Sequence, residues 1–158
     1  MAIKIVEGCL LDQPTEIIVN SWNRNFIPWW LLLPQGVSGA IKRSAGYQPF
    51  VELGKKGVIP LGGAVVTGAG KLAYQAIIHV AGINMFWFAS EYSIRKSVYN
   101  ALQIAQQENY RSIAFPLIGA GTGGFSKTRA LEIMQDEMHK HCFQGTIIIV
   151  KYKNNRKA

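Results

Sequence analysis

Short β-rich runs alternate with helix-like segments along almost the whole chain, and this alternation limits the fold more than any other feature. The β-rich runs occupy residues 3–6, 16–20, 63–67, 75–80, 112–116 and 146–152. Helical patterns occupy residues 37–45, 49–55, 90–108 and 127–141, and the third carries apolar residues at helical spacing. Such alternation predicts an α/β/α fold of three layers, in which helices cover both faces of a mixed, mostly parallel sheet.

Length and composition indicate one globular unit. The chain has 158 residues, of which 49% are hydrophobic and 16% are charged, so we expect a single domain over 1–158 with a basic tail at about 153–158. No apolar run approaches the ~20 residues that span a bilayer, and the first residues do not resemble a signal peptide. Cys9 and Cys142 form no spaced pair, and Cys142 is interpreted as a small apolar filler. We therefore expect a cytoplasmic protein without a metal, a cofactor or a membrane partner.

The charge of the chain is strongly positive. Seventeen Lys and Arg residues stand against nine Asp and Glu, which gives +8, and four of the positive residues lie within 151–158. A basic surface favours anionic partners such as nucleotides, phosphates, nucleic acid or acidic proteins. The charge alone does not choose among them.

Two glycine-containing loops follow strands of the predicted sheet. Ser21-Trp22-Asn23 follows the strand at 16–20, and residues 36–39 then open a helix; residues 117–125 follow the strand at 112–116 and contain four glycines. Ligands of such sheets bind beyond the carboxyl ends of the strands. Glycines let backbone N–H groups point inward, and helix N-termini add positive partial charge. Either loop alone is compatible with a simple tight turn, but two at one edge would suit a pyrophosphate.

Several motifs in order resemble the macro-domain family, which comprises ADP-ribose-binding modules of mixed α/β fold. Gly8-Cys9-Leu10 stands where the family has Gly-Asp-Ile, residues 19–23 match Val-Asn-Ala-Ala-Asn, and residues 36–41 match Gly-Val-Asp-Gly-Ala-Ile. The resemblance covers residues 3–152. It implies that Asn23 binds the distal ribose, that Phe125 lines the distal-ribose side and that Tyr152 stacks near adenine. Backbone amides of the two glycine loops would hold the phosphates.

The resemblance therefore predicts a broad set of ligand-binding residues. They are Cys9, Leu10, Asn20, Asn23, Gly36, Val37, Ser38, Gly39, Gly119, Ala120, Gly121, Thr122, Gly123, Gly124, Phe125 and Tyr152.

Two departures from the family pattern bear on function. Cys9 replaces the aspartate that accepts a hydrogen bond from adenine, and a thiol is a weak acceptor, so we expect weaker adenine selectivity. Ser38 replaces the acidic residue associated with hydrolysis, and no acidic residue falls inside either glycine loop. A two-carboxylate mechanism is therefore not expected. If the protein is catalytic, Asn23 and a bound water carry the reaction. His79, within a β-rich run, is interpreted as a buried core histidine.

The apolar loop at residues 26–34 allows three interpretations. Trp29 and Trp30 form a lid over the distal ribose, or they form an exposed surface for self-association or a protein partner, or the loop folds back and extends the core.

Three functions remain open at this stage. The first is binding of free ADP-ribose or ADP-ribosylated protein. The second is hydrolysis of ADP-ribose derivatives, as an ADP-ribosyl-protein hydrolase, an O-acetyl-ADP-ribose deacetylase or an ADP-ribose 1″-phosphate phosphatase. The third is binding of nucleic acid or poly(ADP-ribose), which ranks lower because part of the charge lies in the tail.

Overall fold

The computed structural model describes residues 1–31, 36–84, 86–121 and 123–153. Six strands form one sheet in the order β1-β6-β5-β2-β4-β3. Their bounds are β1 Ala2–Gly8, β2 Ile17–Trp22, β3 Ala64–Thr67, β4 Ala76–Ala81, β5 Ser112–Pro116 and β6 Thr146–Tyr152. Only the β3–β4 pair is antiparallel among the strand pairs in these described residues. The predicted mixed, mostly parallel sheet is therefore confirmed.

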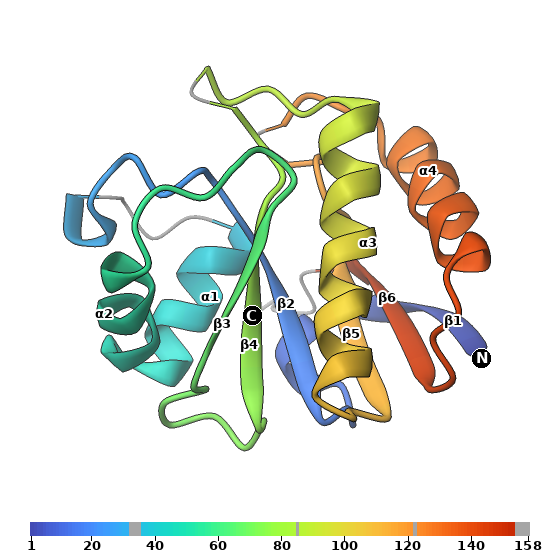
Figure 1. The fold of residues 1–158 in the computed structure, drawn as a ribbon, viewed down its shortest axis with the longest axis horizontal. Helices are drawn as coiled ribbons and strands as arrows, with labels where there is room; N and C mark the ends of the chain where they lie inside the picture. The colour runs from blue at the N-terminus through green and yellow to red at the C-terminus, as the bar shows by residue number, and fades with distance from the viewer. Residues whose placement is uncertain (32–35, 85, 122, 154–158) are drawn as a thin grey trace.

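Helices cover both faces of the sheet, as Figure 1 shows. Helices α1 (Gly36–Ala45) and α2 (Gln48–Lys55) lie on one face, and α3 (Glu91–Gln107) and α4 (Lys127–Lys140) lie on the other. Two short 3-10 helices, η1 (Leu10–Asp12) and η2 (Trp29–Leu31), lie in the connections. The three-layer α/β/α prediction is confirmed. None of the described helices is long and apolar enough to cross a membrane.

Strand β2 shows how the sequence builds the two layers of core. Ile17 and Val19 pack with α3 and α4, whereas Ile18 packs with α1 and α2, because successive side chains of a strand point to opposite faces. All three are fully buried. Burying an aliphatic side chain of this size contributes about 1.5–3 kcal/mol, so this central strand anchors both layers.

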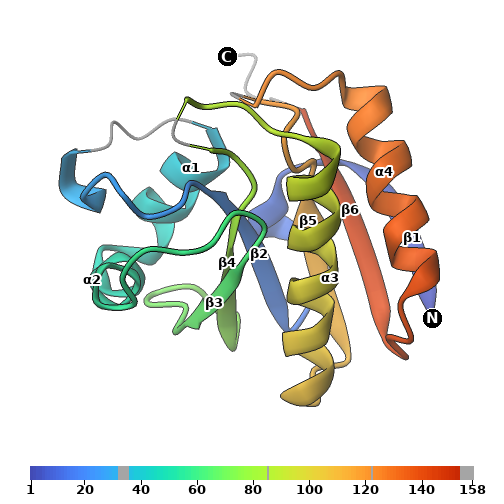
Figure 2. The ribbon, with the colours of Figure 1, turned by 45° about the horizontal axis from the view of Figure 1, so that its top comes forward.

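The carboxyl ends of β2, β4 and β5 meet at the upper edge of the sheet in Figure 2. Two of the loops that follow them are joined, because the Ala89 N–H donates to the Gly123 carbonyl at 2.9 Å. Within the second loop, the Phe125 N–H donates to the Gly119 carbonyl at 3.0 Å. Gly119 has φ +82°, and a Cβ there would lie 2.8 Å from the Ala89 Cβ. Glycine is therefore required at this close approach.

One sequence-based interpretation is contradicted by the structure, and two predictions concern segments that lie partly outside the described residues. Cys142 is exposed, so its interpretation as a small apolar filler is wrong. Of the predicted basic tail, only Lys153 lies within the described residues, as do only residues 26–31 of the apolar loop.

Candidate functional site

A cavity of about 570 Å³ opens at the edge where the strand ends meet. This volume lies within the ~300–1,000 Å³ typical of small-molecule sites. Residues from both predicted loops line it, so the structure brings together segments that lie about eighty residues apart in the chain. The predicted ligand-binding residues in its lining are Asn23, Gly36, Val37, Ser38, Gly119, Gly121 and Gly123.

Other predicted residues from the two loops do not line this cavity. Asn20 is fully buried, and Gly39 is buried within α1. Phe125 packs against the core between the sheet and the α3–α4 layer. Ala120 is half-buried and Gly124 is exposed, while Thr122 lies outside the described residues.

The three residues predicted for the adenine end lie at the ends of β1 and β6. Gly8 pairs with Tyr152 in the sheet, and the Lys153 N–H donates to the Gly8 carbonyl at 3.1 Å. Cys9, half-buried, follows directly, and the Tyr152 side chain is 62% exposed. The Leu10 side chain packs instead into the core beneath α1 and α2. The backbone pairing of these two strand ends therefore places the residue before Cys9 opposite Tyr152, and neither Cys9, Leu10 nor Tyr152 is among the described residues that line the cavity.

A chain of hydrogen bonds runs inward from the cavity wall. The Ser38 hydroxyl donates to Asn20 Oδ1 at 2.8 Å, and Asn20 Nδ2 donates to His79 Nδ1 at 3.0 Å. His79 Nε2 lies 2.8 Å from Thr67 Oγ1, which donates to the Gly68 carbonyl at 2.9 Å. Because Nδ1 accepts, His79 is neutral with its proton on Nε2. Full burial lowers the His79 pKa to about 3, and the interpretation as a core histidine is confirmed.

Internal hydrogen bonds determine which donors and acceptors of Ser38 and Asn23 remain free to bind a ligand. The Ser38 hydroxyl has one proton, which points inward to Asn20 or to the Ser21 carbonyl at 3.3 Å, so Ser38 can only accept from a ligand. Asn23 Oδ1 accepts the Asn25 N–H at 2.6 Å, which leaves the Asn23 amide NH₂ as a donor. The two side chains therefore supply one acceptor and one donor to the cavity.

Lys42 lines the cavity and was missed by the sequence analysis. It is 7% exposed, and its ammonium donates to the Trp29 carbonyl at 2.9 Å. The ammonium also lies 5.1 Å and 5.0 Å from the ring centres of Trp22 and Phe50, and burial lowers its pKa. The sequence signal was its position one helical turn after Ser38, on the same face of α1. Two adjacent basic residues in the last turn of a helix are, however, more typical of a solvated helix end.

The apolar loop divides between two environments. The Trp29 ring lies 5.4 Å from that of Tyr47, and a Cβ at Gly54 would lie 3.3 Å from Trp29 Cδ1, so Trp29 folds back onto the helices. Trp30 is 66% exposed, and Leu31 lines the cavity. Of the two tryptophans, Trp30 is thus the one that remains available as a lid or a partner surface.

The loop after β4 borders the cavity through Ile83 and Trp87, which the sequence analysis also missed. Asn84 Oδ1 accepts the N–H groups of Phe86 and Phe88 at 2.9 Å and 3.1 Å, which closes a tight turn around Trp87. Trp87 has φ +66°, a conformation that bulky residues avoid. Three consecutive aromatic residues after a strand end were the available signal.

The described residues hold no group of three or more His, Cys, Asp or Glu side chains that could bind a metal. Among the lining residues of the described cavity, Lys42 is the sole charged side chain.

Comparisons with known proteins agree with this geometry. Residues 19–134 match the Macro domain family. The chain is 33% identical to an O-acetyl-ADP-ribose deacetylase of Escherichia fergusonii, over 95% of this chain and 88% of the relative. It is 36% identical to a macro domain-containing protein of Caldanaerobacter subterraneus, over 83% and 75% of the two chains.

A solved structure resembles the whole fold. A mutant macrodomain of Oceanobacillus iheyensis with ADPR superposes with a TM-score of 0.81 at 25% identity, over 96% of this chain and 85% of that chain. The resemblance inferred from the sequence motifs is confirmed: the chain belongs to the Macro domain family.

Proposed function

We propose that the protein binds ADP-ribose in the cavity at the carboxyl ends of the strands. The observation that carries this proposal is the meeting of two backbone segments, the N-terminus of α1 and the glycine loop at 119–123, in one lining. Helix N-termini and glycine-rich turns bind phosphate oxygens through backbone N–H groups. The Oceanobacillus iheyensis macrodomain was solved with ADPR, and relatives of this chain are named O-acetyl-ADP-ribose deacetylases.

The proposed pose follows from the chemistry of each end of the site. The pyrophosphate lies between the two backbone segments, and the distal ribose lies at Asn23, whose amide donates to a hydroxyl. Adenine extends toward Cys9 and Tyr152, where an exposed aromatic ring offers a stacking face. The Cys9 thiol accepts hydrogen bonds weakly, so selectivity for adenine over other bases is reduced.

Calorimetric titration with ADP-ribose tests the proposal, with AMP, ribose 5-phosphate and NAD as comparisons. A Gly121→Glu variant tests the position of the site without disturbing the fold, because a Cβ at this cavity-lining glycine meets no atom within 4 Å. The new carboxylate should abolish binding by repelling phosphate while leaving Tm unchanged. Gln106→Glu adds the same charge at an exposed position of α3 and should bind normally. Unaltered binding in Gly121→Glu would contradict the proposal.

Hydrolysis of an ADP-ribose derivative is a second candidate function, favoured by the deacetylase relatives. The Asn23 donor and the Ser38 acceptor are suited to orienting a water, but neither is a base near pH 7. We therefore expect slow turnover. Single-turnover release should be measured with O-acetyl-ADP-ribose, ADP-ribosylated protein and ADP-ribose 1″-phosphate, and Asn23→Ala should remove it. An absence of release from all three substrates would exclude this function.

The ligand is either free ADP-ribose or ADP-ribose attached to a protein, and we propose that residues 1–158 act as one cytoplasmic domain. Trp30 offers a place for a lid or for self-association, because it is largely exposed beside the cavity residue Leu31. Trp30→Ser separates these roles. Weaker ligand binding with an unchanged oligomeric state supports the lid, whereas loss of an oligomer alone supports the partner surface.

Nucleic acid or poly(ADP-ribose) remains the weaker proposal. Lys42 is the single basic side chain in the described cavity lining, so the positive charge of the chain is not gathered there. A steep fall of oligonucleotide affinity with salt would support it.

A further inference from the structure

Lys42 is a buried cation without a carboxylate partner among the described residues. Lys42 is only 7% exposed, and none of the ion pairs in the described part of the chain includes it. An ammonium has three N–H donors, and one of them reaches the Trp29 carbonyl at 2.9 Å. The other donors have no hydrogen-bond partner in the described residues, although the residue lines a cavity large enough for a ligand.

The aromatic neighbours of Lys42 stabilise its position without cancelling its charge. The rings of Trp22 and Phe50 lie 5.1 Å and 5.0 Å from the ammonium, at cation–π distance. These rings also displace water, so the positive charge acts through a medium of lower dielectric constant than the solvent. Ser38, one turn earlier on α1, is neutral. The described cavity lining therefore carries one uncompensated positive charge.

The contacts of Lys42 place it at one end of the cavity. Trp22 directly precedes Asn23, and Trp29 belongs to the segment that follows Asn23. The ammonium therefore lies against the segment that runs from Trp22 to Trp29 and carries Asn23, whereas the glycine loop at 119–123 follows a different strand. In the proposed binding pose this is the end that receives the distal ribose.

We propose that Lys42 is a specificity-determining residue that selects a ligand whose distal ribose carries an anionic substituent, such as a phosphate monoester, over the same ligand with a neutral hydroxyl. The inference rests on the proposed binding of ADP-ribose. A free N–H of Lys42 donates to an oxygen of the substituent, and the charge on both partners strengthens that hydrogen bond. Burial lowers the pKa of Lys42, and an anionic ligand offsets this by favouring the charged amine.

A purely structural role for Lys42 makes a different prediction. If the lysine only held the Trp29 segment against α1, its loss would weaken both ligands by the same factor. Selectivity between a charged and an uncharged distal ribose is therefore the readout that separates the two roles.

The test is calorimetric titration with ADP-ribose and with ADP-ribose 1″-phosphate at equal ionic strength. The wild-type protein should bind the phosphorylated ligand about tenfold more tightly, as expected for one charge-assisted hydrogen bond. Lys42→Met should lose this preference, because its affinity for the phosphorylated ligand should fall about tenfold further than its affinity for ADP-ribose. Lys42→Gln removes the charge but keeps an N–H donor on a slightly shorter side chain, and it should lose the preference as well. Arg43→Met removes the same charge from the exposed neighbouring position and should keep the preference.

Each alternative outcome contradicts a defined step. Equal affinities of the wild-type protein for the two ligands would overturn the role of Lys42 and leave the proposed function intact. A preference that survives in both Lys42 variants, with Tm near that of the wild type, would also overturn it. Failure of the wild-type protein to bind either ligand would overturn the proposed function and this inference with it.

Discussion

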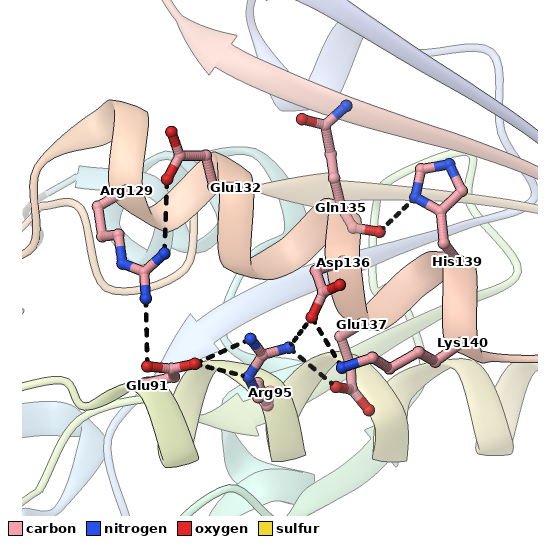
Figure 3. A network of polar contacts seen from close by, with 9 residues as sticks. All are labelled: Glu91, Arg95, Arg129, Glu132, Gln135, Asp136, Glu137, His139 and Lys140. Carbon is pink, nitrogen blue, oxygen red and sulfur yellow. Dashed lines mark hydrogen bonds and ion pairs between the residues drawn. The ribbon is translucent and has the colours of Figure 1, made fainter.

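Positive side chains on the α3–α4 surface have carboxylate partners, whereas the buried lysine of the cavity wall has none among the described residues. On the surface, Arg95 contacts Glu91, Asp136 and Glu137 at 2.8, 2.6 and 3.4 Å, as Figure 3 shows. These contacts raise the pKa of Arg95 and lower those of Glu91 and Asp136. Beneath the cavity, Lys42 has a carbonyl and two aromatic rings as its neighbours.

The comparison separates charges that serve the fold from a charge that the fold leaves uncompensated. Exposed ion pairs add little stability because water and salt screen them. A buried cation without a carboxylate costs stability, so its presence in a cavity wall points to a ligand. The same apolar region holds the neutral His79, whose ring lies 5.8 Å from that of Phe50. This region therefore disfavours added charge, whereas the α3–α4 surface neutralises it.

The largest expected effect is a loss of stability on mild acidification, caused by His79. Its folded-state pKa is about 3, against 6.5 ordinarily, so below pH 6.5 the unfolded chain takes up a proton that the folded protein does not. The free energy of unfolding should therefore decrease as pH falls from 6.5 toward 3, by up to about 1.4 kcal/mol per pH unit. Urea unfolding at several pH values measures this slope.

The pH window distinguishes His79 from the surface network. The pKa values of Glu91 and Asp136 are lowered from 4.5 and 3.8, so their contribution is present above these values and is lost only in stronger acid. His79→Gln should flatten the slope between about pH 6.5 and 5. His141→Gln is the matched control, and because burial also lowers the His141 pKa, it should reduce the slope slightly. An unchanged slope in His79→Gln would contradict the assignment.

The next effect concerns ligand binding at alkaline pH. Because only the protonated Lys42 attracts an anion, and burial lowers its pKa from 10.5, affinity should decrease as pH rises toward that value. We expect ADP-ribose 1″-phosphate to bind more weakly at about pH 9.5 than at about pH 7. Calorimetry at the two pH values measures the change. Lys42→Met should show no such dependence, and equal dependence in both proteins would assign it to another group.

A smaller effect is expected at Trp87, the strained residue of the cavity rim. Glycine adopts φ +66° without strain and alanine does not, so Trp87→Gly should be more stable than Trp87→Ala by about 1 kcal/mol. Both variants should bind ADP-ribose more weakly. Chemical denaturation of the two variants measures the difference.

Trp30 provides the control for this comparison, because its φ is negative. There the glycine variant should be no more stable than the alanine variant. The same order at both tryptophans would show that strain at Trp87 is not the cause.

The smallest effect is expected for Arg95→Met. Loss of its exposed ion pairs should lower Tm slightly at low salt, and the difference from wild type should shrink in high salt, where such pairs are screened. ADP-ribose affinity should be unchanged, in contrast to the selectivity lost in Lys42→Met. Thermal unfolding at two salt concentrations and one calorimetric titration are sufficient. A change in ligand affinity would break the separation between the two regions.

Much of the fold could be predicted from the sequence because its signals are local. The strand at 146–152 and the helix at 90–108 are visible in the order of apolar residues, and the structure has them at nearly the same bounds. The two glycine loops could also be predicted from short stretches of sequence. Each loop follows the carboxyl end of a recognisable strand and contains glycines, which allow backbone amides to face a ligand.

The site was predicted less completely, because the burial of a side chain depends on residues that are distant in the sequence and pack against it only in the folded protein. Lys42 and Arg43 are adjacent and similar in sequence, yet one is buried and the other is exposed. The same limit applied to Leu10, whose side chain enters the core, and to Trp29, which packs on Tyr47 while its neighbour Trp30 does not.

The sequence by itself determined the alternation of strands and helices, the positions of the two glycine loops and the absence of an acidic residue at position 38. Only the tertiary structure decided that Ser38 donates inward, through Asn20 to His79, and that Lys42 faces the rings of Trp22 and Phe50. Asn20 and His79 are 59 residues apart. Periodicity and backbone preference act between neighbours in the chain, whereas charge compensation and hydrogen-bond direction depend on residues that meet only when the layers pack.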